Sequence, residues 1–291
     1  MKDFFILKTM LEKAKEKYKH FSFGESSWGQ ELVCFEIGQG NRCIILQGGM
    51  HAREYVTSFL LLKMLDYLSC FVLPFRVLIC PIVNPDGVEI CTKGKNYYQK
   101  PHFDDKKLNI NKKLINKIGH FDMYKANGRG VDINVNFDCD WGGGKNNFFA
   151  FPYFQNYAGK RPNSESETKA LISLTKKYKP FITISYHSKG EVVYYGYEGA
   201  KKSVKVKSAF YMKAVVPFRY KKAFAKNSTG GYKDYCIKKL NIPSFTIEVG
   251  NDSLCHPIKL DNGEKIFSQN KKSVVKLIKL VLKEEKCKKN L

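Results

Sequence analysis

The sequence predicts an α/β fold, with one mixed, mostly parallel and twisted sheet and helices on both faces. Short apolar runs that end in polar or glycine-rich turns alternate with longer segments of helical periodicity, which favours strands joined through helices. The run 75–83 is apolar almost throughout, as is typical of a strand buried on both faces. In such sheets, binding sites lie beyond the carboxyl ends of the strands.

A single domain over residues 1–291 is expected. The 291 residues, 43% of them hydrophobic, can bury one sizeable core. No linker rich in proline, glycine and serine and no internal repeat interrupts the chain. We expect an N-terminal helix within residues 1–20 and a long variable connection at the Lys- and Asn-rich residues 92–128.

The first half of the chain alternates between strand and helix patterns. Asn84-Pro85-Asp86-Gly87 predicts a turn after the last strand of this half. In order, the expected elements are an amphipathic helix at 4–18, strand-like segments at 21–37 and 42–46, a helix at 55–68 and a strand at 75–83.

The second half continues this alternation. Ser164 is expected as a helix N-cap, and Glu167 three residues later would complete a capping box. In order, the expected elements are a short strand at 130–137, a helix that opens at 162–167, strands at 181–186 and 191–195, a helix at 231–240, a strand at 244–249 and an amphipathic helix at 273–283.

The strongly basic composition does not indicate a protein that binds nucleic acid. Fifty lysines and arginines against 27 acidic residues give a formal net charge of +23. Only six of the 50 are arginine, the residue that suits bidentate contacts to bases and phosphates. We attribute the excess of lysine to compositional bias and expect no specific nucleic-acid partner.

Cysteine usage and hydropathy indicate the compartment. The nine cysteines are an odd number without C-x-x-C spacing, so a reducing compartment is favoured over a disulfide framework. The N-terminal apolar run of four residues is too short for a signal peptide, and no run approaches the ~20 apolar residues of a membrane span. The expectation is a cytoplasmic protein, whose oligomeric state does not follow from the sequence.

Candidate site residues lie at the ends of predicted strands. His51 and His187 each follow one, and Glu248 lies near the end of another. Glu54 can reach the same point in space as His51, and a histidine with a carboxylate supplies two ligands for zinc. Since a catalytic zinc site takes three protein ligands, His187 is the expected third. Taken alone, His51 could be a turn histidine and Glu54 a carboxylate favoured by the helix dipole.

Five motifs resemble those of the zinc metallocarboxypeptidase family. Each is weak alone, but they occur in the order that the family uses, and the resemblance extends from about residue 20 to residue 280. The motifs are His51-Ala52-Arg53-Glu54, Asn84-Pro85-Asp86-Gly87, Gly130-Val131-Asp132-Ile133-Asn134, Tyr186-His187-Ser188 and Phe245-Thr246-Ile247-Glu248.

The resemblance implies a zinc peptidase and assigns roles position by position. It implies that one zinc ion is bound by His51, Glu54 and His187, and that Glu248 is the general base. A metal lowers the pKa of bound water to roughly 7, and a carboxylate beside that water can take its proton.

Three further positions follow from the same resemblance. Arg129 is implied as the cation that polarises the scissile carbonyl and stabilises the oxyanion, although an ordinary surface arginine is the alternative. Asn134 matches a contact to the substrate carboxylate. Asp132 is expected either to orient a ligand histidine or to hold its own turn.

Two departures weaken the interpretation as a simple carboxypeptidase. Pancreatic-type members of the family have Asn-Arg in the carboxylate pocket, whereas Val135 follows Asn134 here. At the position of their mobile substrate-binding tyrosine, this chain has Lys226, which we expect to contact the substrate.

The chain is more similar to another branch, the bacterial γ-D-glutamyl-L-diamino acid peptidases, which cut peptidoglycan stem peptides. This resemblance implies a peptide or muropeptide substrate, contacted by Tyr232 and Glu191. Either Glu191 or Asp234 could meet the amino group of the diamino acid. The segments that carry the resemblance are 124–132, 187–191 and 230–235.

Two other functions remain open. One is a metallocarboxypeptidase that removes C-terminal residues from ordinary peptides. The other is a binding module with a degenerate site, against which the complete ligand set and Glu248 argue.

Overall fold

The computed structural model describes residues 1–94, 119–144, 147, 149–225 and 229–289. Their strands form one eight-stranded sheet in the order β1-β2-β4-β3-β5-β8-β6-β7. The strands are β1 (His20–Glu25), β2 (Glu31–Ile37), β3 (Cys43–Gln47), β4 (Arg76–Cys80), β5 (Ile182–Ser188), β6 (Val192–Tyr195), β7 (Lys221–Phe224) and β8 (Ser244–Val249).

The centre of the sheet is parallel and its flanks are mixed. Strands β4, β3, β5 and β8 run parallel to one another. Antiparallel pairs join β1 to β2, β2 to β4 and β8 to β6, and β7 is parallel to β6. The predicted α/β class with a mixed, mostly parallel sheet is confirmed.

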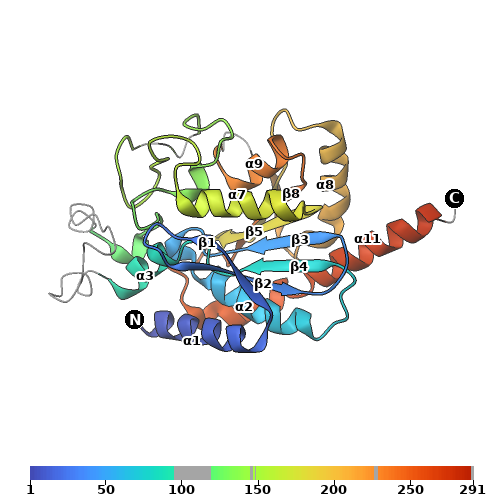
Figure 1. Ribbon diagram of the computed structural model, residues 1–291, viewed down its shortest axis with the longest axis horizontal. Coiled ribbons are helices and arrows are strands. Elements are labelled where there is room, and N and C mark those ends of the chain that lie inside the picture. The colour runs from blue at the N-terminus through green and yellow to red at the C-terminus, as the bar shows by residue number, and fades with distance from the viewer. Residues whose placement is uncertain (95–118, 145–146, 148, 226–228, 290–291) are drawn as a thin grey trace.

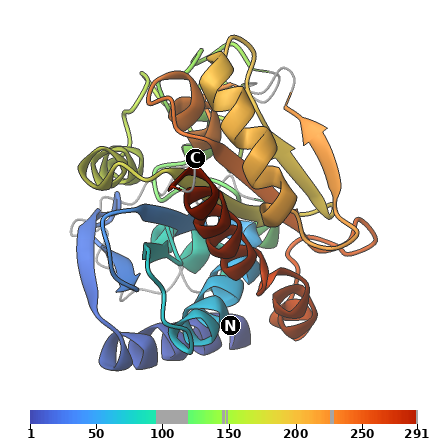
Figure 2. The same ribbon diagram turned by 90° about the vertical axis from the view of Figure 1, so that its right-hand side faces the viewer.

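Helices cover both faces of the sheet, as Figure 1 and the end view in Figure 2 show. Helices α1, α2, α10 and α11 pack into one hydrophobic core, and α7 and α9 into the other. The helices are α1 (Lys2–Lys17), α2 (Val56–Ser69), α3 (Pro85–Lys93), α7 (Ser166–Tyr178), α8 (Lys202–Val215), α9 (Tyr232–Lys238), α10 (Gly263–Asn270) and α11 (Ser273–Lys289), with 3-10 helices η1 (Ala52–Glu54), η2 (Phe121–Met123), η3 (Ile133–Val135) and η4 (Leu260–Asn262). None of the described helices is long and apolar enough to cross a membrane.

Strand β3 serves both cores. Ile44 and Leu46 belong to the core that contains α2, and Cys43 and Ile45 to the core that contains α7. Successive side chains of a strand point to opposite faces, so an apolar run is buried on both sides. This burial holds the strand ends, and the residues that follow them, in place.

Two expected elements differ in the structure. Asn84-Pro85-Asp86-Gly87 forms the start of helix α3 instead of an isolated turn. Asn84 is the N-cap, because its Oδ1 accepts a hydrogen bond from Gly87 N at 2.9 Å, and Pro85 suits the first helical position. The segment 130–137 contains the 3-10 helix η3 and no strand, because Asp132 caps the backbone N–H of Asn134.

The expected capping box at Ser164 is also wrong. Helix α7 begins at Ser166, and Ser164 Oγ donates to Glu165 Oε1 at 2.7 Å. The Glu167 carboxylate is buried and accepts hydrogen bonds from Ser27 N and Asn127 Nδ2. Buried partners from distant segments therefore replace the local cap. Of the predicted 92–128 connection, residues 95–118 lie outside the described part.

Candidate metal centre and active site

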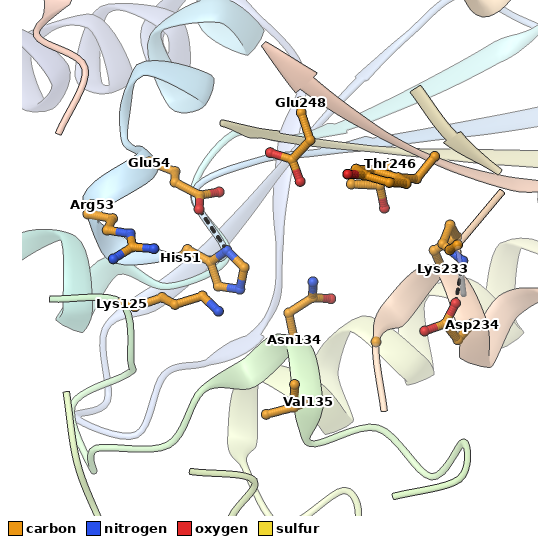
Figure 3. A pocket seen from close by; sticks show the side chains of 13 residues that line it. His51, Arg53, Glu54, Lys125, Asn134, Val135, Lys233, Asp234, Thr246 and Glu248 are labelled. Carbon is orange, nitrogen blue, oxygen red and sulfur yellow. Dashed lines mark hydrogen bonds and ion pairs between the residues drawn. The ribbon is translucent and has the colours of Figure 1, made fainter. Parts of the chain in front are cut away.

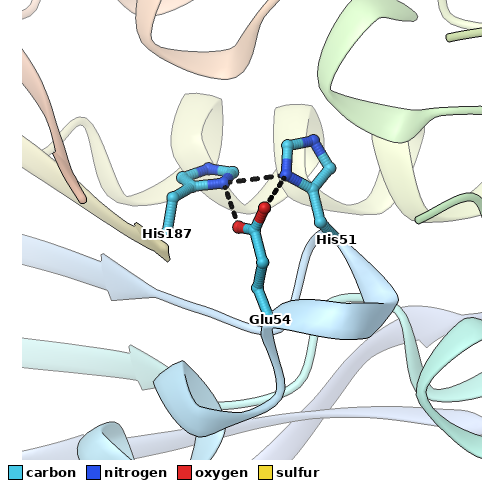
Figure 4. A group of neighbouring side chains, drawn as sticks. All are labelled: His51, Glu54 and His187. Carbon is cyan, nitrogen blue, oxygen red and sulfur yellow. Dashed lines mark hydrogen bonds and ion pairs between the residues drawn. The ribbon is translucent and has the colours of Figure 1, made fainter. Parts of the chain in front are cut away.

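The fold brings the three predicted zinc ligands together at the ends of two neighbouring parallel strands, β3 and β5. His51 Nδ1 lies 3.0 Å from Glu54 Oε1, and His187 Nδ1 lies 3.0 Å from Glu54 Oε2 (Figure 4). The two imidazole Nδ1 atoms are 3.1 Å apart. Residues 136 apart in the sequence thus share one point because β3 and β5 pair in register.

These three side chains fit a single metal ion. Ligand atoms about 2.0–2.1 Å from a tetrahedral zinc are roughly 3.3 Å apart, which is close to the observed spacing. All three residues are buried, and their ligand atoms lie within 4.8 Å of one another. Two imidazoles and one carboxylate are a donor set typical of catalytic zinc, which leaves a coordination position for water or substrate.

Asp132 lies on the opposite side of the His51 ring from these ligands. Its Oδ1 is 3.2 Å from His51 Nε2, and its Oδ2 is 2.8 Å from Lys125 Nζ. Burial opposes ionisation of Asp132, but Lys125 and His51 hold the pKa of this carboxyl well below its usual range. Since His51 turns Nε2 toward Asp132, Nδ1 remains for the metal.

Glu248 lies beside His187 on the adjacent parallel strand, and the two residues pair in register. Burial and the negative charge of Glu54 raise the pKa of Glu248 to about 8. Despite its own burial, Glu54 has a pKa well below its usual range because His51 and His187 surround it. The environment therefore drives the pKa values of the two carboxyls apart, as expected for one acid–base group beside one that stays ionised.

A cavity of about 340 Å³ extends from this centre and is also lined by residues of several other segments. Figure 3 shows its two ends, with His51 and Glu54 on one side and the ion pair of Lys233 and Asp234 on the other. From one end to the other, the lining includes Arg53, Lys125, His51, Glu54, Glu248, Asn134, Val135, Thr246, Lys233 and Asp234.

Of the predicted substrate contacts, the structure places Asn134 in the cavity lining. Its Oδ1 lies 3.2 Å from Tyr232 N and accepts a hydrogen bond from it, which turns Nδ2 toward the cavity (Figure 3). Val135 also lines the cavity and presents an apolar side chain. Lys226 lies outside the described residues.

The structure places two other predicted contacts away from the cavity. Tyr232 is fully buried, and its hydroxyl lies 2.7 Å from Thr175 Oγ1 in the core beneath α7. Glu191 accepts a hydrogen bond from Gln269 Nε2 at 2.9 Å. Neither residue lines the cavity. Tyr232 contributes to the cavity through its backbone N–H, which orients the side chain of Asn134.

Arg129 does not line the cavity either. Its side chain is 54% exposed, and its Nε lies 3.8 Å from Glu165 Oε2. The cations that line the cavity near the metal ligands are Lys125 and Arg53, which sequence reasoning missed. A signal was present for both, because Arg53 stands between two predicted ligands and Lys125 lies within the motif segment 124–132.

A second group of buried carboxyls, the rear cluster, consists of Asp86, Glu165 and Glu167. Asn127 Nδ2 donates to both glutamates, at 2.9 and 3.1 Å. The Oδ1 atom of Asn127 accepts from the backbone N–H groups of Arg129 and Val131. The cluster thereby shapes the loop that leads into Asp132.

Comparison with known proteins agrees with this geometry. The γ-D-glutamyl-L-diamino acid endopeptidase 1 of Lysinibacillus sphaericus is 25% identical over 271 residues, which cover 84% of this chain and 63% of that protein. Carboxypeptidase A2 of Mus musculus is 29% identical over 183 residues, which cover 58% of this chain and 39% of that protein. The chain thus spans less than two thirds of the length of these relatives.

Solved structures share the fold. Thrombin-activatable fibrinolysis inhibitor superposes with a TM-score of 0.72 at 20% identity, over 95% of this chain and 72% of that one. The murein-tripeptide amidase MpaA of Escherichia coli O157 superposes with a TM-score of 0.55 at 21% identity, over 86% and 88%. The family model for zinc carboxypeptidases matches residues 6–263, so the chain belongs to the zinc carboxypeptidase family, whose single zinc site corresponds to the His–Glu–His group.

Proposed function

We propose that the chain is a zinc-dependent peptidase that hydrolyses the bond between the γ-carboxyl group of D-glutamate and a diamino acid in peptidoglycan stem peptides. The main observation in its favour is that two members of the His–Glu–His group, His51 and Glu54, line one cavity with Glu248. In this cavity Val135 occupies the position at which pancreatic-type relatives have arginine. Similarity to the γ-D-glutamyl-L-diamino acid endopeptidase supports the substrate class.

In this proposal His51, Glu54 and His187 hold one zinc ion, which when bound lowers the pKa of water and polarises a carbonyl. Glu248 takes the proton from the attacking water and returns it to the leaving amine. Its position beside His187 and its partial burial suit that role, and such positioned acid–base groups contribute about 10²–10⁴-fold.

We propose Lys125 and Arg53, in place of Arg129, as the cations that stabilise the developing oxyanion. Lys125 Nζ is held by Asp132, so its position is coupled to that of the ligand His51. A cation fixed in advance near developing negative charge lowers the barrier without reorganisation. The Arg129 side chain instead lies beside Glu165.

Asn134 is proposed as a contact for the substrate, because its Nδ2 faces the cavity. An amide donor without a neighbouring arginine binds a carboxylate more weakly than the bidentate guanidinium would. This geometry favours a substrate held along its length over one held chiefly by a C-terminal carboxylate.

The alternative is removal of C-terminal residues from ordinary peptides. The similarity to carboxypeptidase A2 favours it, and Val135 argues against it. The deciding experiment supplies the zinc-loaded protein with L-Ala-γ-D-Glu-meso-diaminopimelate and, separately, with blocked L-dipeptides that have a free C-terminus. We expect zinc-dependent release of diaminopimelate that chelation abolishes and added zinc restores. Cleavage of the dipeptides alone would assign the alternative, and cleavage of neither would refute both.

A further inference from the structure

A hollow outside the active-site cavity is lined by cations and by no carboxylate of the described residues. It lies between the C-terminal end of α8, the turn that follows α8, and helices α10 and α11, and its volume is about 610 Å³. It shares no lining residue with the cavity of the metal centre. The cations are Arg219, Lys272 and Lys276. Within the described part of the chain none of them forms an ion pair, whereas Arg42 and Arg76 each pair with a glutamate.

Phe218 also lines this hollow and is largely exposed to solvent. It is 80% exposed, the largest fraction of any phenylalanine that the structure describes. The guanidinium carbon of Arg219 lies 5.3 Å from the centre of the Phe218 ring. An apolar ring beside cations is typical of surfaces that bind membranes, because the ring enters the boundary of the acyl chains while the cations contact the head groups.

Helix α11 continues the positive charge away from the hollow. Lys272, Lys276, Lys279 and Lys283 are all exposed and follow one another at intervals of four, three and four residues, which places them on one side of the helix. The opposite side of α11 packs into the core that contains α2. Helix α8, which packs beside α11, contains no acidic residue (Figure 2).

The general excess of lysine does not by itself explain this face. Helix α1 is also rich in lysine, but Asp3, Glu12 and Glu16 are interspersed with its lysines, and both Lys15 and Lys17 pair with carboxylates. Compositional bias adds lysine to every surface, but it does not remove acidic residues from one of them. The absence of paired carboxylates around the hollow therefore distinguishes this surface from α1.

We propose that this surface docks on a membrane that contains anionic phospholipids. The surface, called here the basic face, consists of Phe218, Arg219, Lys272, Lys276, Lys279 and Lys283. Lipid phosphates would neutralise cations that have no partner within the described chain, and the hollow offers space for a head group. Each lysine or arginine near such a membrane strengthens binding roughly fivefold. Duplex DNA is the poorer fit, since one arginine suits bidentate phosphate contacts and Phe218 would stay in water.

The first test measures cosedimentation of the full chain with vesicles of phosphatidylglycerol and phosphatidylcholine, and with vesicles of phosphatidylcholine alone. We expect binding to the anionic vesicles that weakens as salt is added, and little binding to the neutral ones. Lys272→Gln/Lys276→Gln should weaken the binding by roughly tenfold or more. Lys169→Gln/Lys176→Gln removes the same charge from exposed positions of α7, which packs into the other core, and should change it less than about threefold.

The second test asks whether Phe218 enters the lipid. In Phe218→Trp the tryptophan emission should move to shorter wavelength when anionic vesicles are added, because the indole leaves water. Phe5→Trp, at an exposed position of α1, is the matched control and should show no such shift. Phe218→Ala should weaken vesicle binding by roughly fivefold to tenfold, since part of the apolar area is lost.

Three results would overturn the proposal. They are no binding to the anionic vesicles, an equal loss in the two double-lysine variants, and equal emission from Phe218→Trp with and without vesicles. Tighter binding to a DNA duplex than to vesicles at the same phosphate concentration would assign the basic face to nucleic acid instead. Hydrolysis of soluble peptides does not involve this face, so its failure would leave the proposed peptidase activity unaffected.

Discussion

The structure contains two groups of largely buried carboxyls, and their partners differ. The carboxyls of the metal centre, Glu54, Asp132 and Glu248, have imidazoles and a lysine as neighbours. Those of the rear cluster accept hydrogen bonds from hydroxyls, amides and backbone N–H groups. The donors are Ser26, Ser27, Trp28, Gln30, Asn127 and Ser164.

The pKa values follow from these partners. At the metal centre, neighbouring charges hold the pKa values of Glu54 and Asp132 low against the effect of burial, and only that of Glu248 is raised. In the rear cluster neutral donors do not offset burial, so the pKa of Asp86 is raised and that of Glu167 rises to about 7. The first group has charged neighbours, as is typical of a site that binds an ion and transfers protons. The second group forms a hydrogen-bond network with neutral donors.

Loss of a metal ligand should have the largest effect. His187→Ala leaves two of three ligands, so zinc content should fall toward zero and activity by more than the roughly 10–100-fold that loss of an outer-shell partner costs. Metal analysis of the purified protein measures this, with the exposed His120 changed to alanine as the control. Full zinc content in His187→Ala would contradict the ligand assignment.

Glu248→Gln should lower kcat by roughly 10²–10⁴-fold while zinc content stays at one per chain, because the proton acceptor is lost and the ligands remain. Steady-state kinetics and metal analysis on the same sample check both parts. Glu264→Gln, at an exposed ion pair with Lys63, serves as the control. An unchanged kcat would rule out Glu248 as the base.

The pair Lys125→Met and Arg129→Met separates the two cation assignments. Lys125→Met should lower kcat by roughly 10²–10³-fold, the cost of losing one oxyanion partner, whereas Arg129→Met should leave it within a few-fold. The comparison is made with saturating substrate. A larger loss of kcat in Arg129→Met than in Lys125→Met would assign stabilisation of the oxyanion to Arg129 instead.

Asp132→Asn should weaken zinc binding by roughly 10–100-fold, since His51 loses the charged partner that orients it. Competition with a chelator of known affinity measures the change. Asp138→Asn, near the same loop but half exposed and paired with Lys239, provides the control. Unaltered zinc affinity would show that Asp132 caps η3 but does not support zinc binding through His51.

The smallest effect on activity is expected in the rear cluster. The folded protein holds the proton of Glu167 more tightly than the unfolded chain, whose pKa is near 4.5. Stability should therefore fall as pH rises from about 4.5 to about 7, and Glu167→Gln should flatten this slope without loss of zinc or activity. Melting temperatures measured across this pH range test it, and an unchanged slope would show that Glu167 is not the titrating group.

Much of the fold could be predicted because its strands are short apolar runs with clear limits. The strand 244–249 and the two-sided burial of 75–83 follow from such patterns. The segment 130–137 misled because its apolar residues alternate as in a strand, whereas the Asp132 cap closes it into η3. The capping box at Ser164 failed because Glu167 finds partners in Ser27 and Asn127, which lie far away in the sequence.

The proximity of His51, Glu54, His187 and Glu248 could be predicted from the sequence because each belongs to a short motif at the end of a strand. The order of the strands in the sheet brings these ends to one edge. The sequence could not predict that Lys125 and Lys233 line the cavity and that Arg129 lies outside it. A charged side chain on a loop or helix can point to solvent, to a carboxylate behind it or into a cavity without any change in local pattern. Here the hydrogen bonds of Asn127 and the Lys125–Asp132 ion pair determine the direction of these side chains. A buried charge requires a partner, and that partner comes from a segment that only the tertiary structure brings near.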